Sequence, residues 1–107
     1  MNPNIIQVQK WSRTEPPTEE ALRQALLAEG LAPERWEAQP GAVFHAQTLS
    51  HGRVICVLTG SITFGFPIEA APTTLRGGDR LDLPPGVPHN AAVGFDGVVC
   101  LEARRSA

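Results

Sequence analysis

Short hydrophobic runs separated by glycine or proline fill the chain after Pro40–Gly41. Runs of this length, bounded by turn-forming residues, predict strands rather than helices. We expect seven strands, at 42–49, 53–59, 61–66, 73–75, 80–83, 91–95 and 98–103. Tight hairpins are expected at Thr59–Gly60 and at 94–97. Seven or eight short strands with no further helical period are typical of a sandwich or a barrel.

The pattern before Pro40 differs and predicts an edge strand and one helix. Residues 5–10 alternate loosely, as an edge strand does. Thr18 is a suitable N-cap for a helix that ends at Gly30, and its apolar face would be Leu22, Ala25 and Leu26. We therefore expect residues 1–35 to pack a strand and a helix on a barrel formed by 36–107, in one structural domain overall.

Composition limits the classes of function. The 107 residues, 42% of them hydrophobic, suffice for one core. A net charge of −2 argues against a nucleic-acid partner. With no apolar run of membrane-spanning length and no signal-peptide pattern, no membrane partner and a cytoplasmic location are expected. Cys56 and Cys100 lie within apolar runs and are expected as buried free thiols.

Residues 77–90 combine a glycine pair, a short alternating strand and a proline-rich turn. Leu81 and Leu83 would share one face of the strand. Pro84 removes a backbone donor, so the strand should end before it. His89 follows the turn and would be held by a stiff loop at the rim of a sheet.

This segment resembles the second sequence motif of the cupin superfamily: Gly, any five, Pro, any one, Gly, any two, His, any three, Asn. Its first four fixed places are occupied by Gly78, Pro84, Gly86 and His89. Val93 replaces the final Asn. The resemblance to small single-domain cupins implies an all-β, double-stranded β-helix, also called a jelly-roll barrel, with one short N-terminal helix. It also implies a homodimer, and the predicted edge strand at 5–10 could pair between chains.

The first cupin motif is degenerate in this chain. It reads Gly, any five, His, any one, His, any three or four, Glu, any six, Gly, and in the family these side chains and the later His hold a divalent metal. Gly41 and Gly60 match its two glycines. Without a gap, its ligand places are taken by Gln47, Leu49 and Arg53. Leucine binds no metal, and a guanidinium repels a dication.

Two alternative sites follow from this degeneracy. In a shifted register, one strand face would carry His45, Gln47 and His51, which with His89 would hold a divalent transition metal such as zinc, iron, manganese, nickel or copper. In the ungapped register, Arg53, Gln47 and His89 would instead form a metal-free site for the carboxylate or phosphate of a small ligand.

The resemblance implies a small-molecule-binding cupin with an altered pocket at the barrel mouth, with or without a metal. The alternative is a metal-dependent enzyme of oxygenase type acting on a small organic substrate, so enzyme activity stays open. Three other acidic residues, Asp79, Asp82 and Glu102, are expected as solvated carboxylates on strand faces.

Overall fold

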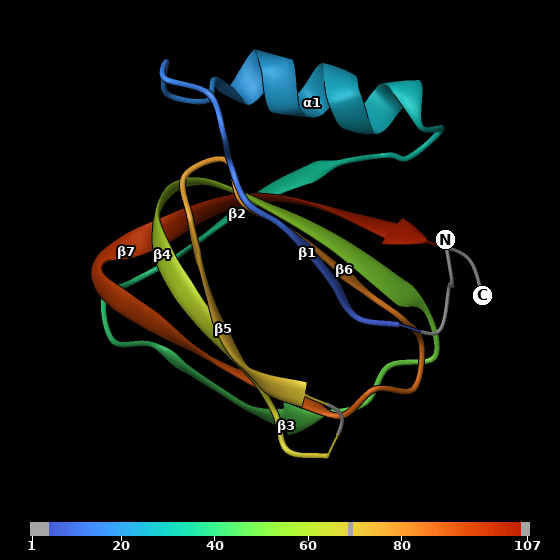
Figure 1. Ribbon diagram of the computed structural model, residues 1–107. Coiled ribbons are helices and arrows are strands. Elements are labelled where there is room, and N and C mark those ends of the chain that lie inside the picture. Colours follow the sequence, from blue (N-terminus) through green and yellow to red (C-terminus); the bar gives the residue numbers. More distant parts are fainter. Residues whose placement is uncertain (1–4, 69, 106–107) are drawn as a thin grey trace.

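The computed structural model describes residues 5–68 and 70–105. Within these residues the elements are β1 (Gln7–Gln9), α1 (Glu19–Ala28), β2 (Glu34–Ala38), β3 (Val43–Gln47), β4 (Gly52–Phe66), β5 (Ala70–Arg76), β6 (Arg80–Leu83) and β7 (His89–Arg105). Neighbouring strands pair antiparallel, and the strands curve around a common interior while α1 lies across one outer side (Figure 1). The predicted all-β barrel with one short helix is confirmed.

Two long, bent strands, β4 and β7, form the frame of the barrel. They pair from Gly52 opposite Arg105 to Gly65 opposite Asn90. The hairpins predicted at Thr59–Gly60 and at 94–97 are therefore wrong, because the chain continues through both as strand. Gly60 and Gly97 have positive φ angles of 79° and 73°, and the pairing register shifts beside Gly60. Glycine bulges of this kind bend a strand without ending it.

Other strand predictions differ at their ends. β3 is shorter than the strand predicted at 42–49, whereas β5 begins at Ala70, before the strand predicted at 73–75. β2 was not predicted, because its sequence, ERWEA, is mostly charged and its side chains are mostly exposed. β2 lies at one end of the sheet and pairs with β7. The expected domain boundary at 35/36 falls inside this strand.

The core has two apolar layers on opposite faces of β4. Ile55 and Val57 point into the barrel, where they pack in the larger hydrophobic cluster. Val54 and Cys56 point outward and pack with Leu22 and Leu26 of the helix in a second cluster. Because alternate residues of a strand face opposite sides, a strand covered on both sides reads as a continuous apolar run.

The helix begins and ends as predicted. The Oγ1 atom of Thr18 accepts a hydrogen bond of 3.1 Å from the backbone N–H of Ala21. At its other end Gly30 has a φ of 79°, and its N–H donates to the carbonyl of Leu27. Ala25, expected on the apolar face, is exposed. No helix in the described part of the chain is long and apolar enough to cross a membrane.

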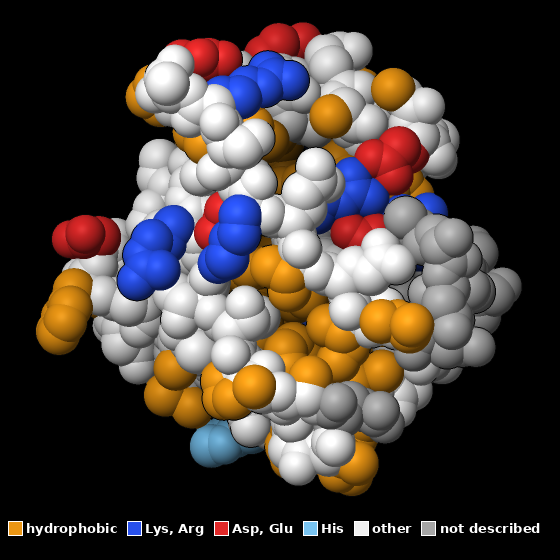
Figure 2. All heavy atoms as spheres, in the orientation of Figure 1, with side chains coloured by type: hydrophobic (Ala, Val, Ile, Leu, Met, Phe, Trp, Pro, Cys, Tyr) orange, Lys and Arg blue, Asp and Glu red, His pale blue; other side chains and the backbone are white. Residues whose placement is uncertain are grey.

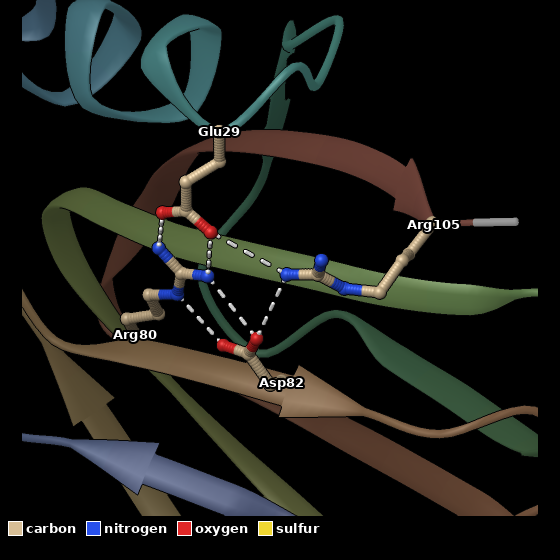
Figure 3. A network of polar contacts seen from close by, with 4 residues as sticks. All are labelled: Glu29, Arg80, Asp82 and Arg105. Carbon is tan, nitrogen blue, oxygen red and sulfur yellow. Dashed lines mark hydrogen bonds and ion pairs between the residues drawn. The ribbon is translucent and has the colours of Figure 1, made fainter. Parts of the chain in front are cut away.

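A charged network joins the end of the helix to the sheet (Figure 3). Arg80 of β6 donates to Glu29 at 2.9 Å and to Asp82 at 2.7 Å, and Arg105 of β7 approaches the same two carboxylates. Two guanidinium groups thus face two carboxylates. Asp82 is an ion-pair partner rather than a freely solvated carboxylate.

Asp79 is also not solvated, because it is buried beneath the N-terminal segment. Its carboxylate accepts hydrogen bonds from the backbone N–H groups of Trp11 and Arg76 at 2.8 and 2.9 Å and pairs with Lys10 at 3.3 Å. Burial alone would raise the pKa of Asp79, but these three partners together hold it below its ordinary value. Asp79 therefore ties the segment after β1 to the barrel.

Candidate functional site

A cavity of about 300 Å³ lies between β2, β3, β4 and β7. This volume is at the lower end of the range of about 300–1,000 Å³ that ligand pockets cover. The cavity is lined by Trp36, Phe44, Gln47, Arg53, Ile62, Phe64, His89, Asn90, Ala91 and Glu102. A largely apolar wall with a few polar groups is the usual composition of a small-molecule site. Figure 2 shows one face of the molecule, on which hydrophobic side chains gather below a row of Lys, Arg, Asp and Glu side chains.

Strand alternation places the polar groups inside. On β4, Arg53 lies two residues before Ile55 and four residues before Val57, both of which face inward. On β7, Glu102 follows the inward-facing Cys100 by two residues, and His89 precedes the inward-facing Ala91 by two. The side chains at even spacing share one face, so both strands carry a polar group at the end of an apolar inward row.

Arg53 is the centre of the polar wall. Its Nε donates to Oε2 of Glu102 at 2.7 Å, and its Nη2 donates to Oε1 at 2.8 Å. The side chains are only 13% and 21% exposed. This is the bidentate geometry that holds a guanidinium and a carboxylate most firmly in one orientation. The Nη1 atom of Arg53 lies 2.9 Å from Nε2 of His89.

The hydrogen bonds of His89 fix its tautomer. Nδ1 lies 2.9 Å from the carbonyl oxygen of Val87, which can only accept, so Nδ1 carries the proton. Nε2 then accepts from Arg53. Burial lowers the pKa of His89 and the Arg53 charge adds to this effect, which outweighs the opposing effects of the Val87 carbonyl and the Glu102 carboxylate. His89 is therefore a neutral imidazole with both ring nitrogens engaged.

Aromatic side chains form the apolar wall. The indole Nε1 of Trp36 donates to Oε1 of Glu102 at 3.0 Å. The Trp36 and Phe44 rings pack edge to face, with centroids 6.2 Å apart. The Phe64 ring lies 6.4 Å from the imidazole of His89. Trp36 thus links the aromatic wall to the charged pair.

The structure brings together Gln47, Arg53 and His89, as the ungapped register requires, but not the metal set of the shifted register. Phe44 pairs with Ala91, and Gln47 pairs with His89, so β3 has one more residue than β7 between these pairs. This bulge breaks the alternation that would have put His45 on the face of Gln47.

His45 and His51 lie outside the cavity. His45 is exposed on β3, and His51 is partly buried in the turn before β4. Among the described residues, no three His, Cys, Asp or Glu side chains are grouped as metal ligands.

The residues of the cavity do not fit a divalent metal. Both nitrogens of His89 already have partners, and a guanidinium nitrogen lies 2.9 Å from the one that faces the cavity. Both oxygens of Glu102 accept from Arg53. A dication here would meet the Arg53 cation at close range, and its donors would first have to be released.

The lining residues that the sequence did not predict as site residues are Trp36, Phe44, Ile62, Phe64, Asn90, Ala91 and Glu102. Glu102 was expected as a solvated carboxylate, which is wrong because it pairs with Arg53 inside the cavity. One signal was present: Glu102 continues the even spacing of Val98 and Cys100, both buried inside the barrel. Trp36 could not be placed, because the strand that carries it was not predicted.

Comparison with solved structures identifies the fold. A cupin superfamily protein from Desulfitobacterium hafniense is 11% identical, with a TM-score of 0.63 over 100% of this chain and 83% of that one. A DUF861 family protein from Thermotoga maritima is 15% identical, with a TM-score of 0.60 over 92% and 97%. An RmlC-like cupin from Shewanella frigidimarina is 22% identical, with a TM-score of 0.61 over 72% and 67%.

By sequence, the chain matches no protein-family model and no curated protein. The likeness therefore rests on the arrangement of the strands, which agrees with the motif of residues 77–90. That motif lies where the sequence placed it: β6 ends at Leu83, the turn contains Gly86 with a φ of 80°, and His89 begins β7 inside the barrel. The chain has the cupin fold.

Proposed function

We propose that the chain binds a small organic molecule in the cavity and does so without a metal. The observation that carries this proposal is the Arg53 side chain, held by Glu102 and His89 in the wall of an otherwise apolar cavity. A guanidinium fixed by two partners is preorganised, so it loses little freedom when a ligand binds.

The lining suggests which parts of a ligand it would contact. Trp36, Phe44 and Phe64 offer flat apolar surfaces for a hydrophobic or ring-shaped body. Gln47 and Asn90 offer amide groups. Arg53 has five N–H donors, of which three serve Glu102 and His89, and so one hydrogen on each terminal nitrogen is left. A compact molecule with an apolar body and a polar end fits these groups.

An oxygenase function has less support. Such chemistry needs a metal that activates oxygen or acts as a Lewis acid, and the donor atoms of the cavity are engaged elsewhere. His89 is also a poor general base, because its Nε2 lone pair accepts from a cation. We therefore assign the residues to binding and give none of them a catalytic role.

The test is a fragment titration followed by NMR. The indole N–H of Trp36 reports on the cavity directly, because it donates to Glu102 in the wall. We expect some fragments with an apolar ring and one polar group to shift this resonance saturably. Their affinity should fall roughly tenfold in Arg53→Met and Phe44→Ala. Arg76→Met serves as the matched control, because Arg76 is exposed and outside the cavity.

Phe44→Ala keeps the test informative if Arg53→Met does not fold, because Phe44 is 40% exposed and its truncation should be tolerated. A fragment set that leaves the Trp36 resonance unchanged would contradict the proposal. So would fragments that bind equally well to the wild type and to Phe44→Ala.

A further inference from the structure

We infer that the cavity selects a ligand with an uncharged polar group, a carbonyl, amide or hydroxyl, over a carboxylate or phosphate. This inference rests on the proposed binding function and names its ligand class. The observation behind it is Glu102, which gives Arg53 an internal counter-ion and so removes the excess positive charge that an anion would need.

The charges that line the cavity cancel. Arg53 is positive and Glu102 negative, with the two groups in bidentate contact at 2.7 and 2.8 Å. His89 is neutral, because its two nitrogens are occupied by the Val87 carbonyl and the Arg53 guanidinium. All the other lining residues are uncharged. Arg104 lies opposite Arg53 in the register of β4 and β7, but its side chain is exposed and does not line the cavity.

An anion would gain little in such a site. Close to Arg53 it would also lie close to the Glu102 carboxylate, and repulsion by the second group would offset attraction by the first. To use the charge of Arg53 fully, the anion would have to displace Glu102, leaving a carboxylate unpaired in a partly buried wall. It would also lose its own hydration.

An uncharged oxygen avoids these costs. It can accept from the two N–H groups of Arg53 that bond to neither Glu102 nor His89, one on Nη1 and one on Nη2, while the pair with Glu102 stays intact. Gln47 and Asn90 can donate to it or accept from it. The ungapped register of the sequence suggested a carboxylate or phosphate, because Glu102 was not placed beside Arg53.

Matched pairs of amide and acid test the inference. We would titrate benzamide against benzoate, and isobutyramide against isobutyrate, at pH 8, where both acids are ionised. The readout is the Trp36 indole resonance. In the wild type we expect the amide of a pair to bind at least roughly tenfold more tightly than the acid.

The variant Glu102→Gln should invert this preference. It keeps the shape of the side chain and removes its charge, so Arg53 is left as an uncompensated cation. We expect affinity for the acid to rise roughly tenfold or more while affinity for the amide changes much less. Glu37→Gln is the control, because Glu37 is exposed on β2 and outside the cavity.

The outcomes separate the two proposals. Acids that bind the wild type as tightly as their amides would overturn the inference and leave the binding function standing. An acid-to-amide ratio that Glu102→Gln does not change would do the same. If neither member of any pair bound the wild type or the variant, the binding function would fail, and the inference with it. The wild-type ratio decides even if Glu102→Gln does not fold.

Discussion

Arg53 decides the character of the site because it stands, with Gln47, at places where the first cupin motif has metal ligands. In one of the two registers that the sequence left open, these two residues share a pocket with His89, and all three line the cavity. The sequence did not predict Glu102, since a single acidic residue near the end of a strand is indistinguishable by pattern from a solvated one. It also left two registers open, because a bulge between Phe44 and Gln47 has no sequence signal.

The Arg53–Glu102 pair should be costly to break from one side. We expect Arg53→Met to lower the free energy of unfolding by about 2 kcal/mol or more, because it leaves the Glu102 carboxylate partly buried and unpaired. The double variant Arg53→Met, Glu102→Leu should recover much of that loss. Urea denaturation of both variants and of Arg76→Met measures this. A double variant less stable than Arg53→Met would contradict the explanation.

His89 should make stability depend on pH. Its pKa is lowered in the folded state, chiefly by burial, so below the ordinary histidine value of about 6.5 the unfolded chain binds the proton more readily. The contribution of His89 is fully present above that pH and is lost as pH falls through the lowered folded pKa.

We therefore expect the free energy of unfolding to fall between pH 7 and pH 5, and to fall less in His89→Gln. Denaturant curves at several pH values in this range measure it. Asp79 and Glu29, whose pKa values are also lowered, act at lower pH. Equal slopes in the two proteins would show that His89 is not the group responsible.

At the scale of elements, the bends of β4 and β7 carry the chain around the barrel. Hairpins were predicted at Gly60 and Gly97, but both glycines lie at bends within continuous strands, because a hairpin and a bulge both favour a glycine with positive φ. Helix α1 was predictable because its cap, its apolar spacing and its terminal glycine are all local signals. β2 was not, since only its pairing with β7 makes it a strand.

The bend can be tested with two glycines of similar φ. A Cβ at Gly60 would lie 1.9 Å from the carbonyl oxygen of Gly97, whereas a Cβ at Gly86 would meet nothing within 4 Å. Their φ angles are 79° and 80°. We expect Gly60→Ala to cost about 2 kcal/mol more than Gly86→Ala, which carries only the backbone strain. Equal losses in urea denaturation would mean that the contact with Gly97 is unimportant.

At the scale of the whole molecule, the expected homodimer and cytoplasmic location stay predictions. β1 lies at one end of the sheet order, and within the described residues its only strand partner is β6. It carries Val8, 40% exposed, near Ile5, 54% exposed. An exposed strand edge with apolar side chains is suited to pairing with a second copy.

If β1 pairs between copies, the mass in solution should be twice 11.5 kDa. Val8→Lys should shift it toward one chain, because edge lysines oppose strand pairing. Light scattering after size exclusion measures both proteins. A wild type of single-chain mass would contradict the homodimer, and a dimer unaffected by Val8→Lys would place the contact elsewhere.

The central claim is that the pocket works through Arg53, Glu102 and His89 and not through a metal. Its most direct test is elemental analysis of untagged protein, produced with zinc, iron, manganese, nickel and copper supplied, beside His89→Ala. We expect the content of each metal to be well below one per chain and the same in both proteins. Near-stoichiometric metal in the wild type that is lost in His89→Ala would contradict the claim.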